Sequence, residues 1–339
     1  MAAKNGGDFV WGVLGASQIG RKVVPALQAG AGMRVGALAA RDRGRAEADC
    51  ARYDIATAYA SYDDLLADPE IDGIYNPLPN DLHVPWSIRA MEAGKHVLCE
   101  KPIALTAEEA RALEEAQART GRLVVEAFMV RHHPQWIAAR ERVRGGGLGE
   151  VRAIQTVFTY HLTDPANIRN RPQNGGGGLY DIGCYAINTA RFLFEAEPER
   201  AIGLFDMDPA FGTDRLASGL MQFPGGRQAS FVCATQTVPT QRVTVLGTKA
   251  RLVVEVPFNA PPERDLTLVR DDGADLFGSG AERIVIPAAD QYTRQAEAFV
   301  AIVREGDPRD PAPIRDAIAN MRVIDALFRS RESGALERV

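Results

Sequence analysis

A glycine-bearing segment near the start of the chain is the first that could do chemistry. It follows an apolar run at 8–14 and reads Gly15-Ala16-Ser17-Gln18-Ile19-Gly20. In the pattern G-x-G-x-x-G between a strand and a helix, the glycines permit a tight turn and close helix packing, so that a pyrophosphate can rest on the helix N-terminus. Ser17 replaces the middle glycine, and serine is small enough for this approach. The segment therefore predicts a dinucleotide site in which Gly15 through Ile19 contact the cofactor; a plain strand–helix turn is the alternative.

The end of the next apolar run bears on which dinucleotide would bind. The run at 33–40 is followed by Arg41 and Asp42. An acidic residue about 20 positions after the glycines binds the ribose hydroxyls of NAD, whereas an arginine accommodates the 2′-phosphate of NADP. Arg41 therefore favours NADP, while the adjacent Asp42 keeps NAD open. Arg41 could also be one of many arginines on a solvated edge.

The elements that must position these residues alternate over the first 125 positions. Short apolar runs predict buried strands, and the segments with helical spacing between them predict helices. We expect strands at 8–14, 33–40, 72–76, 96–100 and 123–128, and helices at 18–30, 43–54, 82–93 and 106–119, the last opened by a capping box from Thr106 to Glu109. This alternation predicts a Rossmann domain with a doubly wound parallel sheet over 1–125.

In the remainder of the chain, 126–339, predicted strands follow one another with few helices between them. Helices are expected at 134–144, 180–194, 290–305 and 314–331, and strands at 151–160, 199–208, 215–223, 227–237, 241–247, 250–256 and 264–270. Pro224-Gly225-Gly226 and Gly247-Thr248-Lys249 lie between strands and predict hairpin turns. The pattern predicts an α+β domain with a large, mainly antiparallel open sheet. The loop 161–179 is long, and long ordered loops are often functional.

Composition narrows the classes of function. The 339 residues are 46% hydrophobic and 24% charged, as in soluble globular proteins. The net charge is −5 without a basic block, which disfavours general nucleic-acid binding. The sequence contains neither a membrane-spanning apolar run nor a secretory signal, so we expect a cytoplasmic protein that does not bind membranes. The four scattered cysteines indicate reduced thiols, and no metal site is predicted.

Five strings further along the chain resemble the motifs of one family. They are Gly94–Pro102 (GKHVLCEKP), Pro79–His83 (PNDLH), Glu126–Pro134 (EAFMVRHHP), Asn167–Arg169 (NIR) and Gly176–Asn188 (GGGLYDIGCYAIN). In order and spacing they are similar to those of glucose–fructose oxidoreductase, inositol dehydrogenase and their relatives, the Gfo/Idh/MocA family. The resemblance spans about residues 8–190. It implies an oxidoreductase that uses NADP or NAD, in which 126–339 would serve substrate binding and oligomerisation.

The resemblance implies roles at single positions. Lys101 matches the lysine of the E-K-P motif beside the nicotinamide, Tyr185 matches the acid/base position, and Asp181 matches an aspartate that binds a substrate hydroxyl. The further positions expected at the substrate are Arg131, His133, Asn167, Arg169 and Tyr292, and those expected at the cofactor are Pro79, Asn80, His83 and Glu100. Structural alternatives exist: Tyr185 could be a core aromatic residue, Asp181 a helix cap and His83 a structural histidine.

A lysine and a tyrosine suit the oxidation of an alcohol. The alcohol carbon loses a hydride to the nicotinamide, and its hydroxyl proton needs a base. A free tyrosine, with a pKa of about 10, is a weak base at neutral pH, and a nearby cation lowers that pKa. In the reductive direction the tyrosine returns the proton. Because Lys101 and Tyr185 belong to different predicted domains, we expect the site to form between these domains.

The nature of the substrate follows from two positions. Tyr185, where many relatives carry histidine, implies the branch of glucose–fructose oxidoreductase, dihydrodiol dehydrogenases and xylose dehydrogenases. Val130 stands where such relatives often carry an aromatic residue, which favours a polar sugar over a dihydrodiol. We expect an NADP-dependent oxidoreductase for a sugar or cyclic polyol, assembled as a homodimer or homotetramer through the C-terminal sheet. A glycosidase-like enzyme with trapped NAD and a non-catalytic nucleotide-binding regulator are the alternatives.

Overall fold

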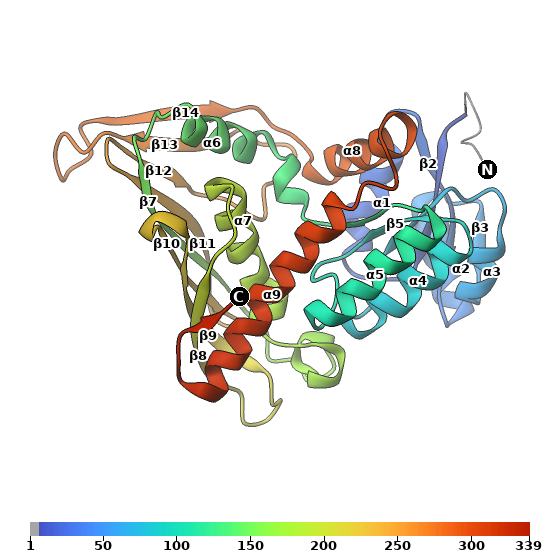
Figure 1. Ribbon diagram of the computed structural model, residues 1–339. Helices are drawn as coiled ribbons and strands as arrows, with labels where there is room; N and C mark the ends of the chain where they lie inside the picture. The colour runs from blue at the N-terminus through green and yellow to red at the C-terminus, as the bar shows by residue number, and fades with distance from the viewer. Residues whose placement is uncertain (1–6) are drawn as a thin grey trace. The chain divides into compact units, whose positions relative to one another are not determined.

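The computed structural model describes residues 7–339, and the chain packs as two compact units (Figure 1). The first unit runs to Met129 and also includes the later segment Tyr292–Ile318. The second unit consists of Val130–Gln291 and Ala319–Val339. Tyr292–Ile318 thus packs with the first unit, although the sequence pattern places it in the C-terminal domain. A division into functional domains near residue 125 remains a proposal.

A six-stranded sheet forms the centre of the first unit. All of its strand pairs are parallel, in the order β3-β2-β1-β4-β5-β6. The strands are β1 (Phe9–Leu14), β2 (Met33–Ala39), β3 (Thr57–Tyr59), β4 (Gly73–Asn76), β5 (His96–Cys99) and β6 (Val124–Glu126). The direction of winding reverses between β1 and β4, and ligands of such sheets bind at the carboxyl ends of the strands at this point. The predicted doubly wound sheet is confirmed.

Helices connect these strands. They are α1 (Gly20–Ala29), α2 (Arg43–Tyr53), α3 (Tyr62–Ala67), α4 (His83–Glu92) and α5 (Ala107–Thr120). The predicted capping box opens α5, because the Thr106 hydroxyl accepts a hydrogen bond from the N–H of Glu109 at 3.1 Å and the Glu109 carboxylate accepts one from the N–H of Leu105 at 3.0 Å. Strand β3 and helix α3 fall outside the sequence prediction, since they are only three and six residues long.

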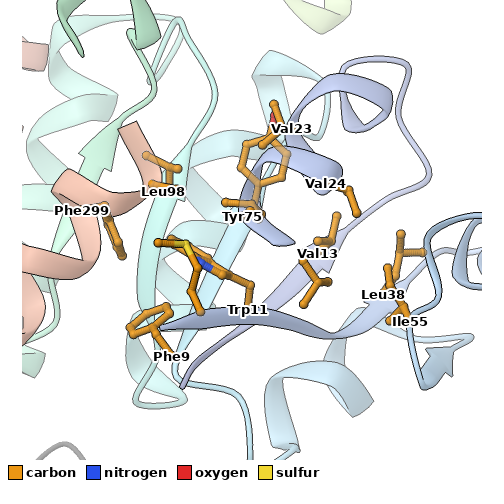
Figure 2. Packing of buried hydrophobic residues seen from close by; sticks show 14 of the residues in the cluster. Phe9, Trp11, Val13, Val23, Val24, Leu38, Ile55, Tyr75, Leu98 and Phe299 are labelled. Atoms are coloured by element: carbon orange, nitrogen blue, oxygen red, sulfur yellow. The ribbon is translucent and has the colours of Figure 1, made fainter. Parts of the chain in front are cut away.

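The core of the first unit explains why a C-terminal helix returns to it. Helix α8 (Gln291–Glu305) lies beside α1, where the Thr293 hydroxyl donates to the carbonyl of Ala26 at 3.2 Å (Figure 1). The ring of Phe299 packs against Trp11, with 5.1 Å between centroids, and against Phe9 (Figure 2). All three rings are buried. Burial of a large apolar side chain stabilises a fold by roughly 1.5–3 kcal/mol, and this contact holds α8 on β1.

A nine-stranded sheet forms the second unit, in the order β14-β13-β12-β11-β7-β10-β9-β8-β15. Its strands are β7 (Val151–His161), β8 (Arg200–Met207), β9 (Asp214–Gln222), β10 (Gln228–Ala234), β11 (Gln236–Gly247), β12 (Arg251–Val254), β13 (Leu266–Asp271), β14 (Ala281–Ile286) and β15 (Glu337–Arg338). Neighbours pair antiparallel except β7 and β10. The mainly antiparallel sheet and the hairpins β9–β10 and β11–β12 are confirmed. Strands β14 and β15 were not predicted.

Three helices accompany this sheet: α6 (Pro134–Arg144), α7 (Cys184–Phe194) and α9 (Ala312–Ser333), whose first residues belong to the first unit. The helix expected at 180–194 begins as a π-helical turn over Leu179–Gly183 and continues as α7. The long loop after β7 contains two 3-10 turns, Ile168–Asn170 and Pro172–Asn174.

Within residues 7–339, no helix is long and apolar enough to cross a membrane. The same residues contain no group of three or more His, Cys, Asp or Glu side chains that could hold a metal ion. The four cysteines are buried and carry free thiols.

Candidate active site

The glycine-bearing turn follows β1 and leads into α1. Gly15 has a φ of +81° and its N–H donates to the carbonyl of Ala39 at 2.7 Å. A Cβ at Gly15 would lie 3.0 Å from the Leu78 side chain, so both the conformation and the space require glycine there. At Gly20, by contrast, the nearest atom to a Cβ would be the Ser17 hydroxyl at 3.4 Å. The close helix–strand packing expected of Gly20 is therefore absent.

Ser17 has a specific role in this turn. Its hydroxyl oxygen accepts a hydrogen bond from the N–H of Gly20 at 3.1 Å, which satisfies one of the main-chain donors at the start of α1. The hydroxyl proton of Ser17 is left to donate to an acceptor such as a phosphate oxygen.

The residues after β2 separate the two dinucleotide alternatives. The Asp42 carboxylate accepts from the N–H of Arg45 at 2.9 Å and so caps α2. The Arg45 guanidinium donates to the carbonyl of Ala16, within the glycine-bearing turn, at 3.1 Å. Arg41 forms a side-chain hydrogen bond with Tyr62, which lowers the Tyr62 pKa against the stronger raising effect of burial. Two exposed guanidinium groups thus lie near this turn, while the nearby carboxylate serves a helix end.

His83 joins the turn after β4 to the turn after β5. Its Nδ1 lies 2.7 Å from the carbonyl oxygen of Pro102 and its Nε2 lies 2.7 Å from that of Leu78. The ring is buried, and burial lowers the His83 pKa to about 4, opposed by these two carbonyl groups. Both ring nitrogens face the main chain, so this geometry favours a positioning role over the polar cofactor contact expected from the sequence.

Lys101 lies in the turn that His83 holds. On one side, the hydroxyl of Tyr75 donates to the Glu100 carboxylate at 2.8 Å, and the N–H of Glu100 donates to the carbonyl of Asn76 at 3.0 Å. On the other side, the N–H of Ile103 donates to the Glu126 carboxylate at 2.8 Å. The main chain before and after Lys101 is therefore fixed to the carboxyl ends of the sheet strands.

The other cofactor and substrate candidates of the first unit lie on neighbouring elements. Pro79 and Asn80 follow β4, where Asn80 begins a short 3-10 turn. Tyr292, expected at the substrate, is half-buried against the core of the first unit and helps to raise the pKa of Tyr75, whose main cause is burial. Tyr292 thus belongs to the same unit as Lys101.

A second group of polar side chains surrounds the start of α7. The Asp181 carboxylate accepts from the Tyr160 hydroxyl at 2.6 Å, and the same oxygen lies 2.9 Å from Nε of Arg169. Asp181 raises the pKa of Arg169, and burial together with Asp181 raises the pKa of Tyr160. Asn167 accepts from the N–H of Arg169 at 3.1 Å and fixes the loop that carries it.

Tyr185 lies on α7, one turn beyond Asp181. Its ring is buried against Phe158, at 5.9 Å between centroids, and Phe258, at 5.3 Å. Tyr185 also contributes to the raised pKa of Arg169, so the phenol lies within electrostatic reach of that guanidinium. A cation at this position favours the phenolate form of a tyrosine.

Arg131 and His133 make contacts within the protein. Nε of Arg131 donates to the side-chain oxygen of Asn188 at 2.8 Å, and its guanidinium lies over the ring of Phe192. His133 is buried, and its Nδ1 accepts from the N–H of Gln135 at 3.1 Å, which caps α6. The Arg131 contacts attach this segment to α7, and the His133 cap stabilises the start of α6. A direct role at the substrate remains a prediction for both residues.

Sequence reasoning missed three side chains of these clusters: Arg45, Tyr62 and Tyr160. Arg45 had a detectable signal, since it lies four residues after Arg41. Tyr62 and Tyr160 had none, because their partners come from distant parts of the chain. The structure defines the class of the first unit: a doubly wound parallel sheet with a glycine-bearing turn after β1 is that of a dinucleotide-binding domain.

Comparison with known proteins gives the family. Residues 9–128 match an oxidoreductase family with an NAD-binding Rossmann fold, and residues 136–253 match the GFO/IDH/MocA C-terminal domain. The chain therefore belongs to the GFO/IDH/MocA family of oxidoreductases, and the resemblance found in its motifs is confirmed.

Three similar proteins illustrate the family. The chain is 47% identical to an uncharacterized oxidoreductase of Rhizobium meliloti, over 97% of this chain and 98% of the relative. It is 37% identical to a D-xylose 1-dehydrogenase (NADP(+)) of Haloferax volcanii, over 96% and 98%. Its fold matches the crystal structure of an aldose–aldose oxidoreductase from Caulobacter crescentus complexed with glycerol, with a TM-score of 0.89 at 27% identity, over 98% of this chain and 100% of that chain.

Proposed function

We propose that this chain is an NADP-dependent oxidoreductase that transfers a hydride between nicotinamide and a hydroxyl-bearing or carbonyl carbon of a sugar or cyclic polyol. The observation that carries the proposal is the 37% identity to an NADP-dependent D-xylose dehydrogenase over nearly the whole of both chains. The aldose–aldose oxidoreductase of similar fold supports the same class of substrate.

The residues beside the glycine-bearing turn fit NADP. A Cβ at Gly15 would fill the space next to Leu78, so the turn keeps its main chain accessible. Arg41 and Arg45 supply two guanidinium groups, which suit a 2′-phosphate. Asp42 caps α2 through one carboxylate oxygen, and Arg41 rather than an acidic residue comes first after the apolar run of β2. NADP, when bound, accepts or supplies the hydride.

Tyr185 is proposed as the acid/base. In the oxidative direction its Oη accepts the proton of the substrate hydroxyl, and in the reductive direction it returns that proton to the developing alkoxide. Arg169 supports this role within the second unit, because its positive charge favours the phenolate. Lys101 is proposed as a second cation for the same proton transfer, and Asp181, with Tyr160, holds Arg169 in place.

Two modes of turnover fit this chemistry. NADP could dissociate after each reaction, or it could stay bound while one sugar is oxidised and another reduced. The absorbance of nicotinamide in the purified protein distinguishes them, since only a trapped cofactor survives extensive dialysis.

A homodimer or homotetramer through the nine-stranded sheet is also proposed. The register of β8, β9 and β10 places Leu204, Leu220 and Val232 on one face, and all three are exposed. Burial of such a face would stabilise an assembly. Analytical ultracentrifugation tests this, and a monomer at micromolar concentration would contradict it.

The phenylalanine variant of Tyr185 tests the proposed chemistry, because it keeps the ring packing and removes the hydroxyl. We expect the Kd for NADP to be unchanged and turnover to fall by about 10²–10⁴-fold, the range of a positioned proton-transfer group. Wild-type kcat for oxidation should rise with pH through an ionisation below the free tyrosine value, and the variant should lose this rise. Matching pH profiles of the two proteins would remove Tyr185 from the mechanism.

A further inference from the structure

Asp214, the first residue of β9, is a buried carboxylate outside every motif of the sequence. One of its oxygens accepts from the N–H of Leu179 at 2.6 Å, and the N–H of Gly178 also donates to it. Leu179 begins the π-helical turn that continues as α7. This turn and the first turn of α7 carry Asp181 and Tyr185.

The start of this helix needs such a partner. The first N–H groups of a helix have no acceptor within the helix. Gly178, at the N-cap position, has no side chain that could cap it. A carboxylate from the neighbouring strand supplies the acceptor, and its negative charge interacts favourably with the positive end of the helix dipole.

The Asp214 carboxylate lies so close to the segment before the helix that glycine is needed there. Gly177 has a φ of +119°, and a Cβ there would lie 1.9 Å from Oδ1 of Asp214. On the other side, a Cβ at Gly176 would lie 2.5 Å from the carbonyl oxygen of Arg169, to which the N–H of Gly177 donates at 2.9 Å. The glycine run therefore packs between Asp214 and the loop that carries Arg169.

We propose that Asp214 is the positioning residue of the active site in the second unit: by holding the start of the helix against β9, it sets Asp181 and Tyr185 relative to Arg169. The inference rests on the proposed function of Tyr185. In this role Asp214 touches neither substrate nor cofactor and acts through Leu179–Gly183.

The ionisation of Asp214 gives this role a pH dependence. Burial raises the Asp214 pKa to about 7, opposed by the N–H groups of Leu179 and Gly178 and by Arg331 on α9. Cys233 on β10 is the further titratable group that faces it. The carboxylate accepts from both N–H groups, whereas a protonated carboxyl turns one oxygen into a donor. Titration of Asp214 therefore changes the hydrogen bonds at the helix start, and the arrangement that accepts both N–H groups is that of the ionised form.

The variant Asp214→Asn tests the proposal, with Asp206→Asn as its matched control, because Asp206 lies in the same unit and pairs with exposed Arg215 at 2.8 Å. The amide presents only one acceptor oxygen. We expect kcat to fall by about 10²-fold, as for a misplaced catalytic group, with the Kd for NADP unchanged and the acid limb of the kcat profile near pH 7 abolished. Hydrogen exchange over 179–184 should accelerate in this variant and not in the control.

Gly178→Ala is the second variant, since its Cβ would press on the Asp214 carboxylate at 3.3 Å without a positive φ. It should lower kcat in the same way, and the effects of the two changes should not add in the double variant. Unchanged exchange over 179–184, or a kcat equal to that of the control, would overturn the proposal. The exchange experiment needs no substrate, so failure of the proposed function would appear separately, as wild-type protein without turnover.

Discussion

Two arginines, Arg41 and Arg45, are expected to set the preference for NADP over NAD. Arg41 bonds to the Tyr62 side chain, and Arg45 donates to the carbonyl of Ala16 in the glycine-bearing turn. If both guanidiniums bind the 2′-phosphate, each charge-assisted contact is worth about 1.5–3 kcal/mol, or roughly 10- to 150-fold in affinity. Both side chains are exposed, so solvent places the effect at the lower end of that range.

The structure predicts different results for the two alanine variants. Arg41→Ala should weaken NADP about 10-fold and leave NAD nearly unchanged, because only NADP carries the phosphate. Arg45→Ala should do the same and also weaken both cofactors by about 5-fold, because the hydrogen bond that steadies the turn at Ala16 is worth about 1 kcal/mol. The double variant should lose most of the preference.

Dissociation constants for NADPH and NADH, measured by titration calorimetry at fixed ionic strength, check these values. Arg43→Ala is the matched control, because Arg43 lies on the same helix and pairs with Glu47 at 2.8 Å. An unchanged ratio in both single variants, or an equal change in the Arg43 control, would refute the assignment of the phosphate to this pair. Equal losses for both cofactors in Arg41→Ala would assign Arg41 to the fold.

Three further predictions concern the turn after β5, the Asp181 cluster and acid stability. Lys101→Ala should reduce turnover by orders of magnitude at an unchanged melting temperature, and Lys101→Arg should also be poor, since a planar fork does not replace an ammonium group; near wild-type kcat for the alanine variant would contradict this. Tyr160→Phe removes a donor from Asp181 and should lower kcat/KM for the sugar roughly 10-fold with the NADP affinity intact; unchanged steady-state kinetics would speak against the cluster. Burial lowers the pKa of His83, His96 and His132 to about 4. The unfolded chain therefore binds more protons than the folded chain between about pH 6.5 and 4, and the free energy of unfolding should fall as the pH decreases through that window. Urea midpoints at pH 7 and 5 measure this fall, and His96→Gln should make it smaller; a pH-independent midpoint would disprove it.

The fold could be predicted where local pattern and tertiary environment agree. Helix α6 begins at Pro134 and ends at Arg144, as the glycines after it indicate. Strand β1 is a continuous buried run and β2 is buried at every residue but Arg34, which is how parallel strands are recognised. The three-residue β3 and the exposed hairpin strand β14 have no such pattern, because they bury little apolar surface.

The site was predictable only where it is encoded by neighbouring residues. The turn at Gly15 and the motif at Lys101 are short strings. Asp214 lies 35 residues from Leu179, its hydrogen-bonding partner, and Tyr160 lies 21 residues from Asp181, so nothing local marks them. His83 shows the converse: the motif identifies the residue, but only the two carbonyl contacts of its ring reveal what it does.

Transfer of deuterium is the most direct test of the proposed function. The purified protein is incubated with NADP and aldoses or cyclic polyols that carry deuterium on the oxidisable carbon, and the nicotinamide is analysed by mass spectrometry. We expect NADPH heavier by one deuterium with at least one of these substrates, at a rate that falls by about 10²-fold or more in Tyr185→Phe. Undeuterated cofactor with every sugar and polyol, from protein that binds NADP, would contradict it.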